Sequence, residues 1–166
     1  ASLMGLIVFS PVLLVAILGI IIFMPGPLLF KQERVGKNRR KFYIFKLRTM
    51  KVDKELEDKR DMSRDDERKT TWGNILRRFK VDELLQLINV LSGDMSLVGP
   101  RPTVIEHVQL YTDNEARRLT MRPGMTGLAQ INGNGALLWE DRIEYDLKYI
   151  DNFSVGLDFY ILLNTV

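Results

Sequence analysis

The 166-residue sequence contains no cysteine and only one histidine, His107. Without cysteine, the chain has no disulfide bridge, no zinc–thiolate site and no thiol nucleophile. His107 lies in the helical pattern VIEHVQLY, where a packed or surface histidine is more common than a catalytic one. Any chemistry must therefore rest mainly on carboxylates, arginines and lysines.

Familiar nucleotide-binding and hydrolase motifs are also missing. The sequence has no G-x-x-x-x-G-K-[ST] loop, no G-x-G-x-x-G, no H-E-x-x-H and no G-x-S-x-G. It also lacks an Asp-x-Asp pair, which disfavours a transferase that brings its metal through such a pair. The carboxylates and basic residues that remain near glycine-proline turns suit phosphate, because arginine forks grip its oxygens and a carboxylate-bound divalent metal offsets further charge.

Charge is absent from residues 1–30, whereas residues 31–51 carry nine basic side chains and one acid, Glu33. An apolar segment followed by basic residues is typical of membrane insertion with the basic side in the cytoplasm. A cleaved signal peptide is disfavoured, because no basic region precedes the run and no small-residue cleavage site follows it. We therefore expect the segment to be retained in the protein.

Proline interrupts the apolar segment at Pro11 and ends it at Pro25-Gly26-Pro27. The helix from Pro11 to Met24 would be about 21 Å long, shorter than the roughly 30 Å hydrocarbon core. Ser10 could bond a carbonyl that proline leaves free, which would make a bend tolerable in lipid. The residues alone leave open a kinked spanning helix and a helix-break-helix that returns to the same face, and they favour the commoner spanning form.

The rest of the chain predicts an α+β fold that is mainly helical. A Gly-Lys-Asn turn at 36–38 and a β-prone run at 42–45 predict a short hairpin. Residues 52–70 are almost all charged and predict a solvated helix or a mobile loop. Glycine-proline turns separate the expected helical regions. These regions are 72–91 with a break near Lys80, 103–119, and 136–166 with a break near 152–154 and Ser154 as an N-cap.

Two adjacent acids, Asp82 and Glu83, begin an apolar helical stretch in RRFKVDELLQLINVL. Acids at a helix N-terminus complement the backbone dipole, and that explanation requires no substrate. The alternative is a catalytic pair, in which an ionised Asp82 near Arg77 attacks phosphorus and Mg²⁺ on Glu83 binds a diphosphate. From these residues alone, the first explanation is the more common.

The chain resembles the monotopic bacterial phosphoglycosyl transferases, also called the bacterial sugar transferase family. The resemblance covers about residues 5–160, and the block around Asp82 is its most specific part. The matching pieces are Ser10-Pro11, KQERVG, FKLRTM, VDELLQLINVLSGDMSLVGPRP, RPGMTGLAQINGNG and DLKYIDNFSVGLD.

This resemblance implies transfer of a sugar 1-phosphate from a UDP-sugar to a polyprenyl phosphate such as undecaprenyl phosphate, with release of UMP. Asp82 would be the nucleophile that forms an aspartyl phosphosugar, and Glu83 would hold Mg²⁺ together with Asp82. The remaining implied residues bind phosphate or substrate. They are Arg77, Arg101, Arg48 and Lys46.

The resemblance also implies a re-entrant membrane helix in residues 1–30, broken at Ser10-Pro11, and a cytosolic catalytic domain in residues 31–166. Under this resemblance we expect a re-entrant helix rather than the spanning helix that the residues alone favour. The resemblance also implies that the protein lies on the cytoplasmic face of the bacterial inner membrane. Leu47 stands where an aromatic is common, a change compatible with packing. Asn134-Gly135 replaces a frequent arginine-asparagine pair, so donor preference could differ. The chain begins already apolar at Ala1, as a partial chain would.

Two other functions fit parts of the sequence. A non-catalytic membrane adaptor would bind anionic lipid through the basic residues of 31–51 and a partner protein through the charged stretch at 52–70. Nucleic-acid binding is disfavoured, because the basic region lacks an aromatic platform of known type and follows an apolar anchor. The expected partners are therefore a UDP-sugar, a polyprenyl phosphate and membrane lipid.

Overall fold

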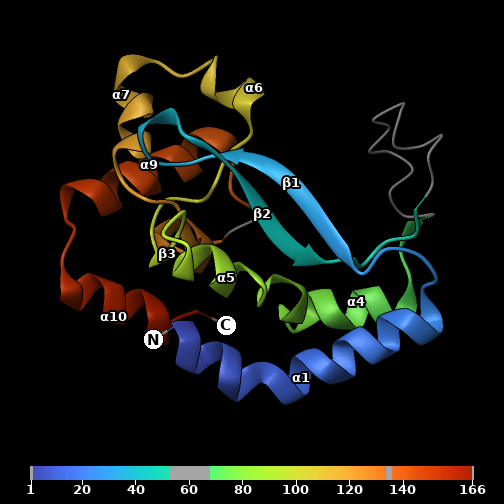
Figure 1. Ribbon diagram of the computed structural model, residues 1–166. Helices are drawn as coiled ribbons and strands as arrows, with labels where there is room; N and C mark the ends of the chain where they lie inside the picture. Colours follow the sequence, from blue (N-terminus) through green and yellow to red (C-terminus); the bar gives the residue numbers. More distant parts are fainter. Residues whose placement is uncertain (1, 53–67, 134–135, 166) are drawn as a thin grey trace. The chain divides into compact units, whose positions relative to one another are not determined.

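The computed structural model describes residues 2–52, 68–133 and 136–165 (Figure 1). It is α+β, as predicted, with an apolar N-terminal helix and a two-stranded hairpin of β1 (Leu29–Val35) and β2 (Lys41–Leu47). The chain forms two compact units. Unit 1 contains residues 3–31 and 45–85, and unit 2 contains residues 32–44 and 86–166 together with Ser2.

The units do not divide at residue 30, where the membrane and cytosolic domains were expected to meet. The apolar helix α1 (Ser2–Phe23) shares unit 1 with residues 45–85. The chain passes from one unit to the other inside the hairpin strands. A boundary between membrane and cytosol at residue 30 remains a prediction.

The helix α1 continues across Pro11 without an interruption in its assignment, and Figure 1 shows a bend along its length. Pro11 has no N–H to donate to the carbonyl of Ile7, four residues earlier. Ser10 Oγ donates to that same carbonyl at 2.7 Å. The predicted serine compensation is therefore confirmed, although the chain stays in the helix at Pro11 and does not break there.

At 22 residues, α1 is about 33 Å long, and its mean hydropathy is 3.0, so its length and composition would allow it to cross a membrane. Most of its large side chains are exposed. They include Leu3, Met4, Ile7, Val8, Phe9, Val12, Leu14, Val15, Leu18, Ile21, Ile22 and Phe23. Such an exposed apolar surface suits lipid. Whether the helix spans the bilayer or re-enters remains a prediction.

One stripe of α1 is buried, and it builds the core of unit 1. The stripe consists of Leu13, Ala16 and Ile20 and continues at Met24, just beyond the helix, and these residues pack with Leu47 and Leu76. Their three- and four-residue spacing places them on one helix face. Leu47, the departure noted in the FKLRTM motif, is 2% exposed, so its expected packing role is confirmed.

The helix α4 (Thr71–Arg78) contributes a side chain that packs directly on α1. Thr70 caps α4 by accepting from the Gly73 amide at 3.0 Å. Trp72 Nε1 donates to the Ala16 carbonyl at 3.3 Å, and its ring lies where a Cβ on Gly19 would stand. Gly19 thus lets an indole lie directly on the backbone of α1.

In unit 2, the predicted turn at 36–38 is present as η1 (Lys37–Arg39), with Asn38 at φ 55°. The helix α5 (Gln86–Leu91) is joined to β2 by Asn89 Nδ2, which donates to the Tyr43 carbonyl at 2.7 Å. The strands β3 (Ser96–Val98) and β4 (Gly124–Thr126) pair in parallel, with Val98 opposite Thr126.

Short helices make up most of the rest of unit 2. They are α6 (Ile105–Val108), α7 (Asp113–Ala116), η4 (Arg117–Thr120), α8 (Leu128–Ile131), α9 (Trp139–Asp151) and α10 (Val155–Leu163). The helix expected over 103–119 is divided because Thr112 and Glu115 form a capping box that starts α7. Ser154 Oγ accepts from the Leu157 amide at 3.2 Å, so its predicted N-cap role is confirmed. The charged stretch expected at 52–70 lies largely outside the described residues, as does Asn134-Gly135.

The contact between Gly19 and Trp72 gives a stability prediction. A Cβ on Gly19 would lie 2.2 Å from Trp72 Cε2, so Gly19→Ala should lower the free energy of unfolding by about 1–3 kcal/mol. Gly156→Ala in α10 is the matched control, because no atom lies within 4 Å of the new Cβ. It should stabilise by up to about 1 kcal/mol through helix propensity. Denaturant unfolding in detergent, followed by tryptophan fluorescence, measures both, and equal stability of the two variants would contradict the packing argument.

Candidate active site

The acid pair lies in a tight turn between two helices. Lys80 adopts a left-handed conformation at φ 57°, which ends the helical path of α4. Asp82 and Glu83 then lie in η3 (Val81–Glu83), a single 3₁₀ turn before α5. The break expected near Lys80 is confirmed. The acid pair was expected to begin a helix. It lies instead in this three-residue turn, which has little helix dipole to stabilise the carboxylates.

Asp82 is a buried carboxylate, 7% exposed, and its Oδ1 has no hydrogen-bond partner among the described residues. Burial is the main factor that raises the pKa of Asp82, and the neighbouring charge of Glu83 adds to it. Lys46 and Arg77 lower the pKa, but by less. Arg77 therefore favours the ionised form, as expected, but burial outweighs it, so the pKa of Asp82 is raised rather than lowered.

Cationic side chains of unit 1 surround the acid pair. Lys46 Nζ on β2 forms an ion pair with Glu83 Oε1 at 2.6 Å, and each side chain is about one-fifth exposed. Arg77 Nε donates to Thr49 Oγ1 at 2.7 Å, and the Arg77 charge acts on the carboxyl of Asp82. The structure thus brings together Lys46, Arg77, Asp82 and Glu83 from three segments of unit 1. Sequence reasoning missed the hydrogen bond from Arg77 to Thr49, because no local pattern links the two residues.

The acid pair also belongs to the core that buries α1. Val81 and Leu84, which flank Asp82 and Glu83, are half-buried against the cluster of Leu76 and the α1 stripe. The turn that carries the acids is therefore held by the same apolar contacts that hold the N-terminal helix. The position of the carboxylates relative to α1 follows directly from this packing.

The site offers few side-chain ligands for a metal ion. No group of three or more histidine, cysteine, aspartate or glutamate side chains occurs in the part of the chain that the structure describes. Mg²⁺ commonly uses only one or two carboxylates and completes its shell with water and substrate phosphates. The unpartnered Oδ1 of Asp82, next to Glu83, fits that sparse type of site.

Arg48 has a different place from the other predicted basic residues. It is 6% exposed, and its Nη2 donates to the carbonyl of Met24, just beyond the end of α1. Gly26, at φ 122°, lies against the guanidinium, and a Cβ there would lie 3.1 Å from Nη1. Burial lowers the pKa of Arg48. A cation at a helix C-terminus is favourable, so this arginine anchors the end of α1.

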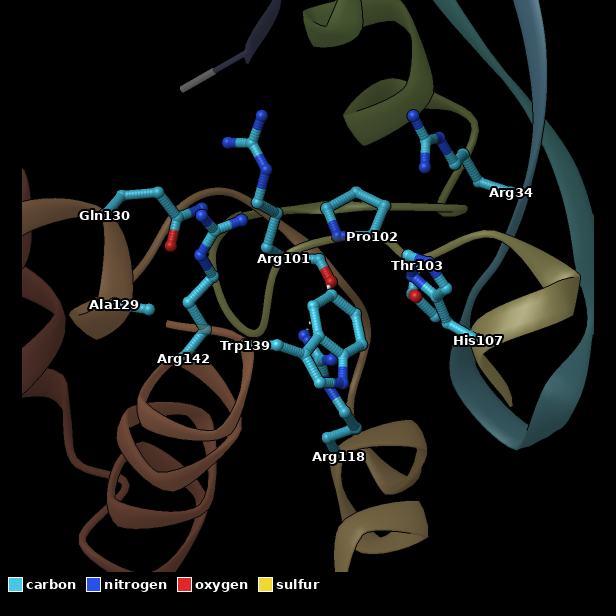
Figure 2. A pocket seen from close by; sticks show the side chains of 10 residues that line it. All are labelled: Arg34, Arg101, Pro102, Thr103, His107, Arg118, Ala129, Gln130, Trp139 and Arg142. Atoms are coloured by element: carbon cyan, nitrogen blue, oxygen red, sulfur yellow. Dashed lines mark hydrogen bonds between the residues drawn. The ribbon is translucent and has the colours of Figure 1, made fainter. Parts of the chain in front are cut away.

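Arg101 lines a pocket of about 160 Å³ in unit 2 (Figure 2). The pocket is rich in arginine and contains two aromatic residues. Its lining is Arg34, Arg101, Pro102, Thr103, His107, Arg118, Ala129, Gln130, Trp139 and Arg142. His107 packs edge-on against Trp139, with 4.4 Å between ring centroids, so the expected packed histidine is confirmed.

Backbone hydrogen bonds fix the turn that carries Arg101. The Gly99 amide donates to the Thr126 carbonyl and the Gly124 amide to the Pro100 carbonyl, both at 2.9 Å. A Cβ on Gly124 would lie 2.1 Å from the Gly99 nitrogen, so the two glycines permit an approach that other residues would block. This explains why the GPRP and RPGMTG motifs need glycine at these points.

A buried ion pair supports the same turn from below. Arg118 and Asp146 side chains are 3% and 1% exposed and pair directly. Arg118 Nη2 also donates to the Arg101 carbonyl at 3.1 Å, which Figure 2 shows as a dashed line. Burial raises the pKa of Asp146 to about 6, although Arg118 lowers it. Sequence reasoning missed this pair, because its members lie 28 residues apart with no local pattern.

The comparison with protein families matches residues 1–166 to the bacterial sugar transferase family. An uncharacterized sugar transferase of Bacillus subtilis is 46% identical over 141 residues, which cover 85% of this chain and 69% of the relative. A protein of Caulobacter vibrioides named UDP-glucose:undecaprenyl-phosphate glucose-1-phosphate transferase is 45% identical over 166 residues, covering 95% of this chain and 62% of the relative.

A third relative, from Aeromonas hydrophila, is named UDP-N-acetylgalactosamine-undecaprenyl-phosphate N-acetylgalactosaminephosphotransferase. It is 38% identical over 172 residues, covering the whole of this chain and 41% of the relative. This chain thus corresponds to only part of several relatives, and their names differ in the sugar. Because the family match extends over every residue, the chain belongs to the bacterial sugar transferase family.

Proposed function

We propose that the protein transfers a sugar 1-phosphate from a UDP-sugar to undecaprenyl phosphate and releases UMP through a covalent aspartyl phosphosugar. The observation that carries this proposal is the buried carboxylate of Asp82, whose Oδ1 has no partner among the described residues. The names of the relatives support the acceptor and the reaction class.

In the first step, a carboxylate oxygen of Asp82 attacks the sugar-bearing phosphorus, and the phosphorus–oxygen bond to UMP breaks. UMP leaves with the bonding electrons. Burial disfavours the ionised form of Asp82, so conversion to an acyl phosphate removes a charge that is costly in that position. Arg77 and Lys46 place positive charge beside the reacting phosphate.

In the second step, a phosphate oxygen of undecaprenyl phosphate attacks the same phosphorus. The bond from phosphorus to Asp82 breaks, and the carboxylate is regenerated for another cycle. The product is a polyprenyl diphosphate sugar. Lys46 keeps its ion pair with Glu83 during both steps. This pair reduces the electrostatic repulsion between the Glu83 carboxylate and the substrate phosphates.

We also propose Mg²⁺ as the cofactor, held by Glu83 and Asp82 together with the diphosphate of the donor. When bound, the ion would offset the negative charge of the phosphates. The sparse carboxylate set supports this assignment, because substrate oxygens would complete the shell.

We propose that α1 is a monotopic, re-entrant membrane helix on the cytoplasmic face of the inner membrane. The exposed apolar side chains of α1 and the Ser10 hydrogen bond at the Pro11 bend support this arrangement. The shared core of α1, Val81 and Leu84 would then place the carboxylates close to the lipid headgroups.

Asp82→Asn should abolish both UMP release and the phosphosugar adduct, because an amide is a far weaker nucleophile than a carboxylate. Intact mass spectrometry after incubation with a panel of UDP-sugars alone measures the adduct, and a UMP assay with undecaprenyl phosphate measures turnover. The control is Asp113→Asn on exposed α7, which should behave as wild type. Normal turnover in Asp82→Asn would rule out the nucleophile, and a wild-type enzyme that turns over without an adduct would indicate direct transfer.

Removal of divalent ions with EDTA should reduce UMP release to background, and added Mg²⁺ should restore it. Glu83→Gln should raise the Mg²⁺ concentration required for half-maximal activity by about tenfold or more, because one anionic ligand is lost. Undiminished activity in EDTA would contradict the cofactor assignment.

The re-entrant arrangement can be tested by labelling, because the chain has no cysteine of its own. In spheroplasts, Leu3→Cys, at a 61% exposed position, should resist a membrane-impermeant maleimide and should react once the membrane is opened. Replacement of Ser10-Pro11 by Ala-Ala should straighten α1 and expose residue 3 on the outside. Leu110→Cys, at an 80% exposed position, is the cytoplasmic control. Unchanged protection in the double variant would contradict the role assigned to the bend.

A further inference from the structure

Four arginines line the pocket of unit 2. They are Arg34, Arg101, Arg118 and Arg142, and Asp146 forms an ion pair with Arg118. Burial and the nearby charge of Arg101 both lower the pKa of Arg34, while Glu106 raises it by less. Guanidinium groups that repel one another at a concave surface are stabilised by an anion, and phosphate is the anion that their geometry suits best.

Three polar atoms at this pocket are buried without a hydrogen-bond partner in the described structure. They are Arg34 Nε, Gln130 Nε2 and Gln130 Oε1. Buried polar atoms are nearly always paired, so such a group at a pocket points to a ligand. A phosphate can accept from Arg34 Nε and Gln130 Nε2. A fully ionised phosphate cannot donate to Gln130 Oε1, so a ligand with a further hydrogen-bond donor matches this group better.

The pocket is also preorganised for a ligand. The Arg118–Asp146 pair fixes the Arg101 carbonyl, and Figure 2 shows the Arg101 side chain extending from the other side of that turn. Arg118 lies over the Trp139 ring at 5.7 Å and donates to the Tyr111 hydroxyl at 2.7 Å. With these neighbours held by buried contacts, little ordering entropy remains to be lost on binding.

We propose that this pocket binds the uridine nucleotide portion of the donor. Arg34 and Arg101 hold its phosphates, and the Gln130 amide reads the imide edge of uracil, whose N3–H donates and whose O4 accepts. This inference rests on the proposed function, which supplies a UDP-sugar as donor. An ionised polyprenyl phosphate offers acceptors only, so it leaves Gln130 Oε1 unpaired and suits the pocket less well.

The test is equilibrium dialysis of labelled UMP, ribose 5-phosphate and inorganic phosphate against the full chain in detergent micelles. UMP should bind the wild type at least tenfold more tightly than the other two. Gln130→Leu should weaken UMP binding about tenfold, because two buried hydrogen bonds are lost, and should leave inorganic phosphate binding within twofold. Arg34→Gln should weaken all three ligands.

Gln109→Leu is the matched control, because Gln109 is exposed and lies outside the pocket lining. Gln130→Glu serves as a second variant if the leucine disturbs folding, which thermal unfolding would reveal. It keeps an acceptor for N3–H but loses the donor to O4, so it too should weaken UMP binding. Unchanged UMP binding in folded Gln130 variants would overturn the inference. So would equal binding of ribose 5-phosphate and UMP, or displacement of UMP by farnesyl phosphate at equal affinity.

The same titration in Asp82→Asn separates this inference from the proposed function. That variant should retain wild-type UMP affinity, because binding does not need the nucleophile. If the wild type forms no adduct but UMP affinity still depends on Gln130, the proposed chemistry fails and the pocket assignment stands. If the adduct forms normally and the Gln130 variants bind UMP as the wild type does, only the pocket assignment fails.

Discussion

Burial of a carboxylate away from water costs free energy unless a cation pairs with it, and each unit of this protein contains one such buried carboxylate. Asp146 in unit 2 pairs with Arg118, and the pair in turn holds the backbone of Arg101. Asp82 in unit 1 is buried beside Glu83 and keeps an oxygen without a partner. One buried acid thus supports a turn, and the other is the nucleophile of the proposed reaction. Burial is the main cause of the raised pKa of each group, but of the two only Asp146 forms an ion pair within the part of the chain that the structure describes.

The core of unit 1 joins the apolar anchor to the acid pair. The stripe of α1 packs against Leu47 and Leu76, and the residues that flank the acids pack against the same cluster. Arg48 adds a polar contact to the carbonyl of Met24. An apolar helix that is usually regarded as a tether is here a structural part of the candidate site. Substitutions on its buried face should therefore affect the acid turn as well as membrane attachment.

Local features were predicted well from the sequence. The hairpin turn, the break at Lys80, the N-cap at Ser154 and the serine bond at the proline bend each depend on a few neighbouring residues. Their physical causes lie within one or two turns of chain. That locality is why hydrophobic period, capping chemistry and proline geometry were sufficient to find them.

Features that depend on distant residues were missed or wrong. The Arg118–Asp146 pair and the pocket around Gln130 bring together segments with no shared pattern. The pKa of Asp82 was expected to favour ionisation, since a nearby arginine is visible in sequence whereas burial is not. Arg48 was expected to bind phosphate, and that role stays a prediction; its contact with the Met24 carbonyl was not foreseen. The proposal that Asp82 attacks phosphorus came from the resemblance to known transferases rather than from sequence physics.

The contact between Trp72 and the backbone of α1 has a kinetic consequence if the protein works at a membrane as proposed. Because an indole and an apolar stripe lock the anchor to the catalytic turn, the reactive carboxylate stays at a fixed depth relative to the lipid. A lipid-linked acceptor then reaches it by lateral diffusion within the leaflet. The search for the second substrate becomes two-dimensional, and its rate depends on surface density and membrane viscosity rather than on concentration in the cytosol.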